Sequence, residues 1–195
     1  LTLSKYFTKD LHDLASGVEV TQKRWYSTYE GNTANSLVLQ WDRTDDQCLW
    51  VLSTNDKYNP LIPENTRVAL AASDLDNINA FSEEPSWPDE NLFGKEDRNT
   101  WCYYYESADL ARQRGDWGAI TDLYAQAKTE GFSPSNGVEP IPFIEGFARA
   151  GNADIALDLT LIARSLTPNL RDYTCDTWNR LSTSLSGDPL FDSEY

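Results

Sequence analysis

A short turn that occurs twice is the feature of this sequence that most constrains its fold. Gly115-Asp116-Trp117 and Gly151-Asn152-Ala153 lie 36 residues apart (151 minus 115), and the same offset relates Ala127 to Ala163. An apolar pattern of helical period precedes and follows each turn. Repeats of this length, built as helix, glycine turn and helix, are typical of stacked helical hairpins. Because such arrays usually bind or scaffold other molecules, the repeat predicts architecture more directly than activity.

The region from Trp101 onward is predicted to be helical. Four helices should form two antiparallel hairpins between Trp101 and Thr167, and a fifth should cap them. No strand is expected between Ala108 and Ala127. The predicted helices cover roughly 101–114, 116–130, 139–150, 153–166 and 171–185.

The first hundred residues follow a different pattern. β-Branched and aromatic residues concentrate in three segments separated by polar turns, which predicts an antiparallel meander. These segments are 18–29, 36–41 and 48–52. We expect this sheet to pack on the hairpins through Trp25, Trp41 or Trp50.

Two less regular segments flank the predicted meander. Residues 3–14 have the apolar spacing of a short amphipathic helix. Residues 81–99 form an acidic, proline-containing connector, for which Trp87, Leu92 and Phe93 are predicted anchors. The predicted fold class is therefore α+β, with a small antiparallel sheet region in a mixed domain over 1–100 and a helical repeat domain over 101–186.

Charge and hydropathy exclude some classes of partner. The chain has 16 basic and 31 acidic residues, for a net charge of −15, and both halves are acidic. Since phosphate contacts need clustered Lys and Arg, no nucleic-acid binding is expected. No run approaches the roughly 18–20 apolar residues of a membrane helix, so no direct membrane insertion of this segment is expected.

The sequence contains three cysteines and one histidine, and no C-x-x-C pair occurs. No zinc site of the usual Cys and His type is therefore expected. Cys102 begins the first predicted repeat helix and Cys175 lies in the last. They would meet if the last helix packs back on the first. A Cys102–Cys175 disulfide is therefore one prediction, and two buried free thiols are the alternative.

No catalytic motif is recognisable. The glycine-rich loops of nucleotide-binding proteins, the zinc protease motif and the serine hydrolase elbow are all absent from the sequence. Asp74 and Asp76 resemble a calcium loop, but Asn79 and Pro85 stand where Gly and Glu are needed. No catalytic residue and no cofactor is assigned. The 31 acids leave an acid-pair glycosidase as an open alternative.

The second repeat resembles a tetratricopeptide (TPR) unit. Gly151, Ala156, Ala163 and Pro168 match the family's turn glycine, small packing residues and terminal proline. The first repeat departs from the pattern, because Ile120 replaces the first alanine. In TPR proteins the first helix of each hairpin lines a concave groove, and the resemblance assigns these residues to it: Tyr105, Asp109, Arg112, Ile141, Glu145 and Arg149.

The chemistry of these residues favours a protein or peptide partner, with a glycan as an alternative. Arginine matches carboxylates with two parallel hydrogen bonds, and tyrosine suits a peptide or a sugar edge. The alternative is that they form surface ion pairs. The dense aromatic run from Trp101 to Tyr105 leaves a similar choice between core packing and a sugar platform.

A second resemblance covers about residues 20–180. The chain is similar to the soluble C-terminal region of large bacterial polytopic glycosyltransferases of the dolichyl-phosphate-mannose mannosyltransferase type. The segments that carry the likeness are 24–27, 36–41, 48–52, 92–94, 101–106, 108–117 and 142–151. In that family the catalytic carboxylate lies near the first membrane helices, so no catalytic position is carried over.

These resemblances imply a non-catalytic, extracytoplasmic interaction or accessory domain that is tethered to a membrane glycosyltransferase-like protein. The alternatives are a free-standing TPR-like adaptor, cytoplasmic or secreted, and the acid-pair glycosidase. The absence of an initial Met fits a fragment or a processed product.

Overall fold

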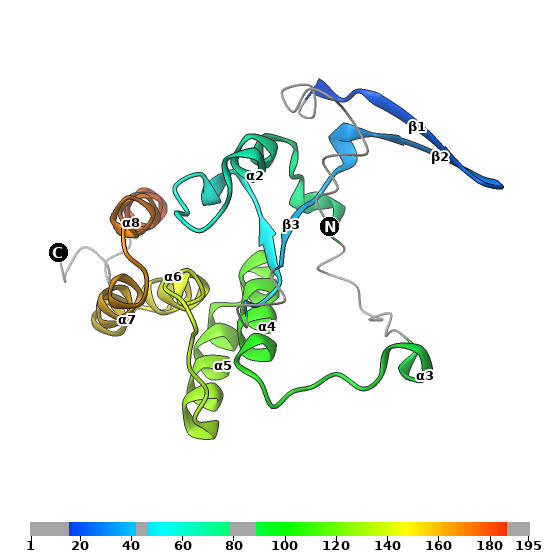
Figure 1. The fold of residues 1–195 in the computed structure, drawn as a ribbon. Helices are drawn as coiled ribbons and strands as arrows, with labels where there is room; N and C mark the ends of the chain where they lie inside the picture. The colour runs from blue at the N-terminus through cyan, green and yellow to red at the C-terminus, as the bar shows by residue number, and fades with distance from the viewer. Residues whose placement is uncertain (1–15, 42–46, 79–88, 187–195) are drawn as a thin grey trace. The chain divides into compact units, whose positions relative to one another are not determined.

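The computed structural model describes residues 16–41, 47–78 and 89–186 and has an α+β fold (Figure 1). The chain divides into two compact units. One contains residues 1–41 and 50–78, and the other contains residues 42–49 and 79–195. The first holds two small antiparallel sheets and short helices, and the second holds the helical array. The sequence-based boundary at residue 100 stays a prediction.

The first unit begins with a hairpin of two strands, β1 (Glu19–Arg24) and β2 (Ser27–Asn32). Their register runs from Glu19 opposite Asn32 to Arg24 opposite Ser27, so Trp25 and Tyr26 form a two-residue turn. The prediction of a single strand over 18–29 is therefore wrong. Neither glycine nor asparagine, the usual residues of such a turn, marks its place in the sequence.

A second sheet pairs β3 (Val38–Gln40) with β4 (Trp50–Leu52). It is separate from the hairpin, so the predicted three-stranded meander is wrong. The helical turn η2 (Thr33–Asn35) lies between β2 and β3, and the Asn32 side chain accepts the Ala34 N–H at its start at 2.8 Å. This local cap ends the first ladder before the chain enters the second sheet.

Short helices complete the first unit: η3 (Thr54–Asp56), α2 (Glu64–Ala69), η4 (Leu70–Ala72) and η5 (Leu75–Asn77). Its buried apolar side chains include Trp50, Leu52, Ile62 and Leu70. The packing prediction named Trp25, Trp41 or Trp50 as the contact with the hairpins. Trp50 is buried, at 1% exposure, whereas Trp25 and Trp41 are 99% and 62% exposed, so only Trp50 remains a candidate and the contact itself stays a prediction.

The second unit contains the helices expected from the repeat: α4 (Trp101–Arg114), α5 (Trp117–Glu130), α6 (Ile141–Arg149), α7 (Ala153–Leu166) and α8 (Arg171–Leu185). A short helix α3 (Glu90–Phe93) precedes them. α4 packs on α5, α6 packs on α7, and α8 packs on α6 (Figure 1). The prediction of two hairpins and a fifth helix is confirmed.

The turn glycines explain why the helices end where the repeat predicts. Gly115 and Gly151 both adopt the left-handed backbone conformation, with φ of 68° and 79°. This conformation closes a helix and is far more accessible to glycine than to other residues. In the first turn the Asp116 carboxylate then accepts the Ala119 N–H at 3.0 Å and starts α5.

Ile120, the residue that departs from the TPR pattern, fits because α6 carries a glycine opposite it. A Cβ atom added to Gly146 would lie 2.4 Å from Cγ2 of Ile120. Ile120 is fully buried. At the close contact of α5 and α6, the large residue is therefore on α5 and the small one is on α6. The TPR pattern instead has a small residue at the position of Ile120.

The aromatic run at the start of α4 packs in the core. Trp101, Tyr104 and Tyr105 are all buried, and the Trp101 ring lies 5.3 Å from that of Phe143 on α6. The core-packing alternative is thus confirmed for these three. Leu92, a predicted connector anchor, is 78% exposed, so that prediction is wrong. The prediction for Trp87 and the helix over 3–14 lie outside the described residues, and so does the Phe93 side chain.

Candidate functional site

α4 places three of the predicted groove residues on one face. The Thr100 hydroxyl caps the helix by accepting the Tyr103 N–H at 3.3 Å. Tyr105, Asp109 and Arg112 then follow at spacings of four and three residues, which is the period of one helical face. Tyr105 and Asp109 are each only 5% exposed, so this face is buried.

α6 repeats the arrangement with Ile141 and Glu145. Ile141 is 1% exposed and Glu145 is 5% exposed. A carboxylate buried to this degree needs positively charged or hydrogen-bonding partners, since desolvation strongly disfavours an isolated charge. The partners of Glu145 come from two other helices.

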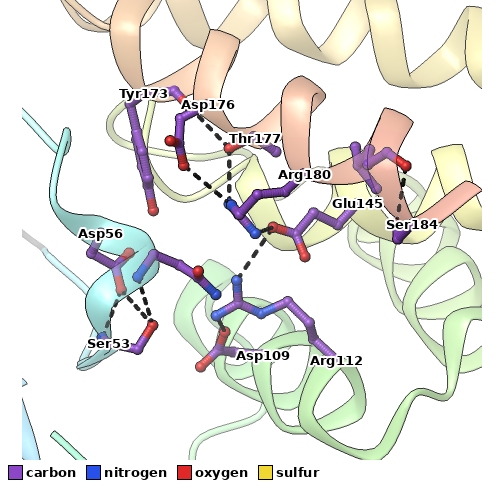
Figure 2. A network of polar contacts seen from close by, with 12 residues as sticks. Ser53, Asp56, Asp109, Arg112, Glu145, Tyr173, Asp176, Thr177, Arg180 and Ser184 are labelled. Carbon is purple, nitrogen blue, oxygen red and sulfur yellow. Dashed lines mark hydrogen bonds and ion pairs between the residues drawn. The ribbon is translucent and has the colours of Figure 1, made fainter.

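Two arginines share the Glu145 carboxylate, as Figure 2 shows. Nη1 of Arg112 on α4 lies 3.6 Å from Oε1 of Glu145, and Nη1 of Arg180 on α8 lies 3.2 Å from the same oxygen. Arg112 also pairs with Asp109, at 2.5 Å between Nη2 and Oδ1. Arg180 also pairs with Asp176, at 3.2 Å between Nε and Oδ2.

We call these five residues, Asp109, Arg112, Glu145, Asp176 and Arg180, the ion network. It connects α4, α6 and α8 through charge-assisted hydrogen bonds and ion pairs. Arg180 gains a further partner, because Nη2 donates to the Thr177 hydroxyl at 3.3 Å, and Thr177 donates to the Tyr173 carbonyl at 3.0 Å. The network holds three helices in one arrangement.

Sequence reasoning missed Asp176 and Arg180. A signal for them was present, since an acid four residues before an arginine on a predicted helix indicates an ion pair on one face. What the spacing does not reveal is the long-range contact between Arg180 and Glu145, which are 35 residues apart.

The predicted groove residues are thus brought together only in part. The structure joins Asp109, Arg112 and Glu145 in the ion network, whereas the Arg149 guanidinium lies over the Trp117 ring, 4.8 Å from its centroid. Tyr105 and Ile141 are buried. A ligand would have to displace internal ion pairs to reach these carboxylates, so their role in binding stays a prediction.

Glu139, which sequence reasoning did not single out, is a second buried carboxylate. It is fully buried just before α6. It accepts the Ser135 N–H at 3.0 Å, the Ser135 hydroxyl at 3.2 Å and the Asn136 amide at 2.9 Å. Burial raises the pKa of Glu139 above its ordinary value, and the hydrogen bonds from Ser135 and from the backbone of Cys48 only partly oppose this.

The raised pKa of Glu139 predicts a particular pH dependence of stability. A carboxyl with a higher pKa in the folded state binds more protons folded than unfolded. The contribution of Glu139 to the free energy of unfolding is fully present below the pKa of the carboxyl in the unfolded chain, about 4.3. It is lost as the pH rises through the pKa in the folded state. The loss has a slope of up to about 1.4 kcal/mol per pH unit.

We therefore expect the free energy of unfolding of Glu139→Gln to fall furthest below that of the wild type at pH 5. The gap should narrow as the pH rises. Urea unfolding of both proteins at a series of pH values measures the difference. Glu130→Gln, at the exposed end of α5, controls for the loss of one negative charge. A difference that is constant with pH, or that grows in the wild type's favour at high pH, would show that burial does not raise this pKa.

The disulfide joins Cys48 to Cys102, and Cys175 is free and exposed. The predicted Cys102–Cys175 pairing is therefore wrong, and so is the alternative of two buried free thiols. α8 packs against α6, and its Cys175 Sγ lies 3.6 Å from a nitrogen of Arg164 on α7. The bridge instead ties Cys48 to the first turn of α4.

The outer face of α7 carries aliphatic side chains that the unit does not cover. Leu161 is 65% exposed, and four others are 37–44% exposed. At 100° per residue these side chains form two strips on either side of Asp154, Asp158 and Ser165. We call this surface the α7 face, and its aliphatic residues are Ile155, Leu157, Leu161, Ile162 and Leu166.

Two common features of functional proteins are absent from the described residues. No helix there is long and apolar enough to cross a membrane. Within the same residues, no group of three His, Cys, Asp or Glu side chains is arranged to hold a metal ion. No protein-family model, no curated protein and no solved structure matches the chain. Any function must therefore be argued from the geometry.

Proposed function

We propose that this chain is a non-catalytic interaction domain whose helical array binds a partner protein through the α7 face. The observation that carries the proposal is the exposure of five aliphatic side chains on one helix, of which Leu161 is the most exposed at 65%. Single exposed aliphatic residues are common on protein surfaces, whereas five on one helix, gathered in two strips beside a line of polar residues, are a reason to propose an interaction site.

The charges beside the α7 face define the partner. Asp154 and Asp158 lie between its two apolar strips, and both are exposed. The whole chain has a net charge of −15. A complementary surface is therefore an amphipathic helix with an apolar strip and basic residues beside it, which is a common way for helices to dock. A second copy of this acidic chain would bring like charges together, which disfavours self-association.

The disulfide supports an extracytoplasmic location. Cys48 and Cys102 are linked, and disulfides form and persist mainly in oxidising, extracytoplasmic environments. Together with the resemblance over about residues 20–180, this supports an accessory domain tethered to a membrane glycosyltransferase-like protein. Multiple membrane helices encoded upstream of Leu1 in the same reading frame would bear out the tether, and their absence would favour the free-standing adaptor.

Designed peptides test the docking directly. We expect a labelled amphipathic peptide of about 15 residues, with leucines on one face and lysines beside them, to bind the full chain in fluorescence anisotropy. The same peptide with glutamates in place of lysines should bind much more weakly. Leu161→Asn combined with Ile162→Asn should weaken the lysine peptide about tenfold or more, because apolar contact area is lost.

The control variant is Leu92→Asn, which removes an exposed leucine from α3 and should leave binding unchanged. Circular dichroism of each variant checks that the helices are retained. Undiminished binding of the lysine peptide to the double variant would mean that general charge attraction, and not the α7 face, holds it. Equal binding of the glutamate peptide would contradict the charge of the proposed partner.

A further inference from the structure

The turn of the β1–β2 hairpin presents two adjacent aromatic side chains to solvent. Trp25 is 99% exposed and Tyr26 is 104% exposed relative to a free residue. They form the two-residue turn, and six residue pairs from Glu19–Asn32 to Arg24–Ser27 hold the strands on either side of it. The hairpin is visible in Figure 1 as a paired ribbon with its turn at the free end. We call Trp25 and Tyr26 the aromatic tip.

The backbone conformation of Trp25 is one that disfavours a bulky residue, so folding alone does not explain a tryptophan at this position. Its φ is 51°, in the left-handed region. Two-residue hairpin turns that need this conformation strongly prefer glycine or asparagine, because a Cβ atom and a bulky side chain are strained there. An indole at such a position contributes no buried surface to offset the strain. An outlier of this kind is a reason to look for a function.

Charge changes sign along the hairpin. Lys23 and Arg24 stand next to the aromatic tip in the sequence, whereas Glu19 and Glu30 lie toward the other end. Glu30 is opposite Thr21, three pairs from the last pair. This is about 10 Å at the rise of a strand. Since the Debye length in physiological salt is about 8 Å, the charge of Glu30 is partly screened at the tip.

We propose that the aromatic tip binds the interface of an anionic lipid membrane. Trp25 and Tyr26 would enter the headgroup region, and Lys23 would lie against lipid phosphates, with Arg24 as a second positive charge at this point of the sequence. Trp and Tyr favour this region because each combines a large apolar ring with a polar group. Basic residues beside them gain from the negative surface potential of the bilayer. The contact is peripheral and involves no spanning segment.

Lipid is favoured over a glycan or a protein pocket by the shape of the tip. Both rings are fully exposed at the end of a projecting hairpin, whereas small ligands bind in concave sites where polar groups converge. A fluid interface needs no complementary pocket and accepts a convex pair of rings. This proposal does not depend on the α7 face, which lies in the other compact unit, so the two can fail separately.

Co-sedimentation of the full chain with lipid vesicles tests the proposal. We expect the wild type to sediment with phosphatidylcholine vesicles that contain phosphatidylglycerol, despite a net charge of −15, and much less with phosphatidylcholine alone. Trp25→Ala with Tyr26→Ala should reduce the bound fraction about tenfold or more. Lys23→Gln with Arg24→Gln should abolish the preference for the anionic vesicles.

Trp41→Ala is the matched control, because Trp41 is an exposed indole of the same unit that lies outside the hairpin. It should bind vesicles as the wild type does. The proposal is overturned if the wild type binds neither vesicle, if the aromatic double variant binds as well as the wild type, or if Trp41→Ala loses binding equally. Quenching of the Trp25 fluorescence by an oligosaccharide, without vesicle binding, would instead assign the tip to glycans.

Discussion

Replacing Gly137 by alanine is expected to lower the free energy of unfolding of the helical unit by about 3 kcal/mol, the upper end of the usual cost of overpacking. A Cβ atom at this position would lie 2.1 Å from the Ala163 carbonyl oxygen and 2.9 Å from Cδ2 of Leu170. The Gly137 N–H also donates to the Thr167 hydroxyl at 2.8 Å, which fixes the loop against the end of α7. Because the nearest atom belongs to the backbone of a helix, no rotamer change relieves the clash.

Thermal unfolding followed by far-ultraviolet circular dichroism measures the effect, which should be a fall of about 10 °C or more in the midpoint. The control is Gly118→Ala. A Cβ atom there meets nothing closer than Asp116 Oδ1, at 3.8 Å, within α5. Alanine is favoured over glycine inside a helix, so this variant should be slightly more stable than the wild type. A Gly137→Ala protein as stable as Gly118→Ala would mean that the loop does not lie against α7.

Arg112→Met is expected to destabilise the protein by about 3–5 kcal/mol, which is the usual cost of breaking a buried ion pair from one side. Methionine keeps much of the side-chain volume but removes the charge. The carboxylates of Asp109 and Glu145, each 5% exposed, then lose the guanidinium that lies between them. Urea denaturation gives the loss of free energy directly.

Neutralising the carboxylates should restore stability. We expect the triple variant Arg112→Met, Asp109→Asn and Glu145→Gln to recover most of the loss, because the uncompensated buried charges are gone. Arg98→Met is the matched control, since the Arg98–Glu96 pair, at 2.9 Å, is exposed and such pairs contribute little. If Arg112→Met behaves like Arg98→Met, the ion network does not hold the helices together.

The helical array was predictable because its signals are local. Gly115 and Gly151 stand at the left-handed turns that end the helices before them, and a helical stretch follows each one directly. The β1–β2 hairpin was not predictable for the complementary reason. Its turn consists of Trp25 and Tyr26, which are strand-forming residue types, so the sequence reads as one continuous strand.

The candidate site was predictable only as a set of helix positions. The spacing that places Asp109 and Arg112 on one face of α4 is local, and so is the spacing that places Glu145 on α6. Whether a face is open or buried depends on what packs against it, and α8 supplies Arg180 from 35 residues away. The disulfide was mispredicted for the same reason, since Cys48 is 54 residues from Cys102.

The most direct test of the interaction proposal is photo-crosslinking from the α7 face in the full-length protein in its own cells. A photoreactive residue placed at Leu161 should give one major crosslink to another protein, at a segment with an amphipathic helical pattern and basic residues beside its apolar face. The same residue at Leu92 should not give that product. Crosslinks from position 161 that match those from position 92, or that map to an acidic or non-amphipathic segment, would contradict the account.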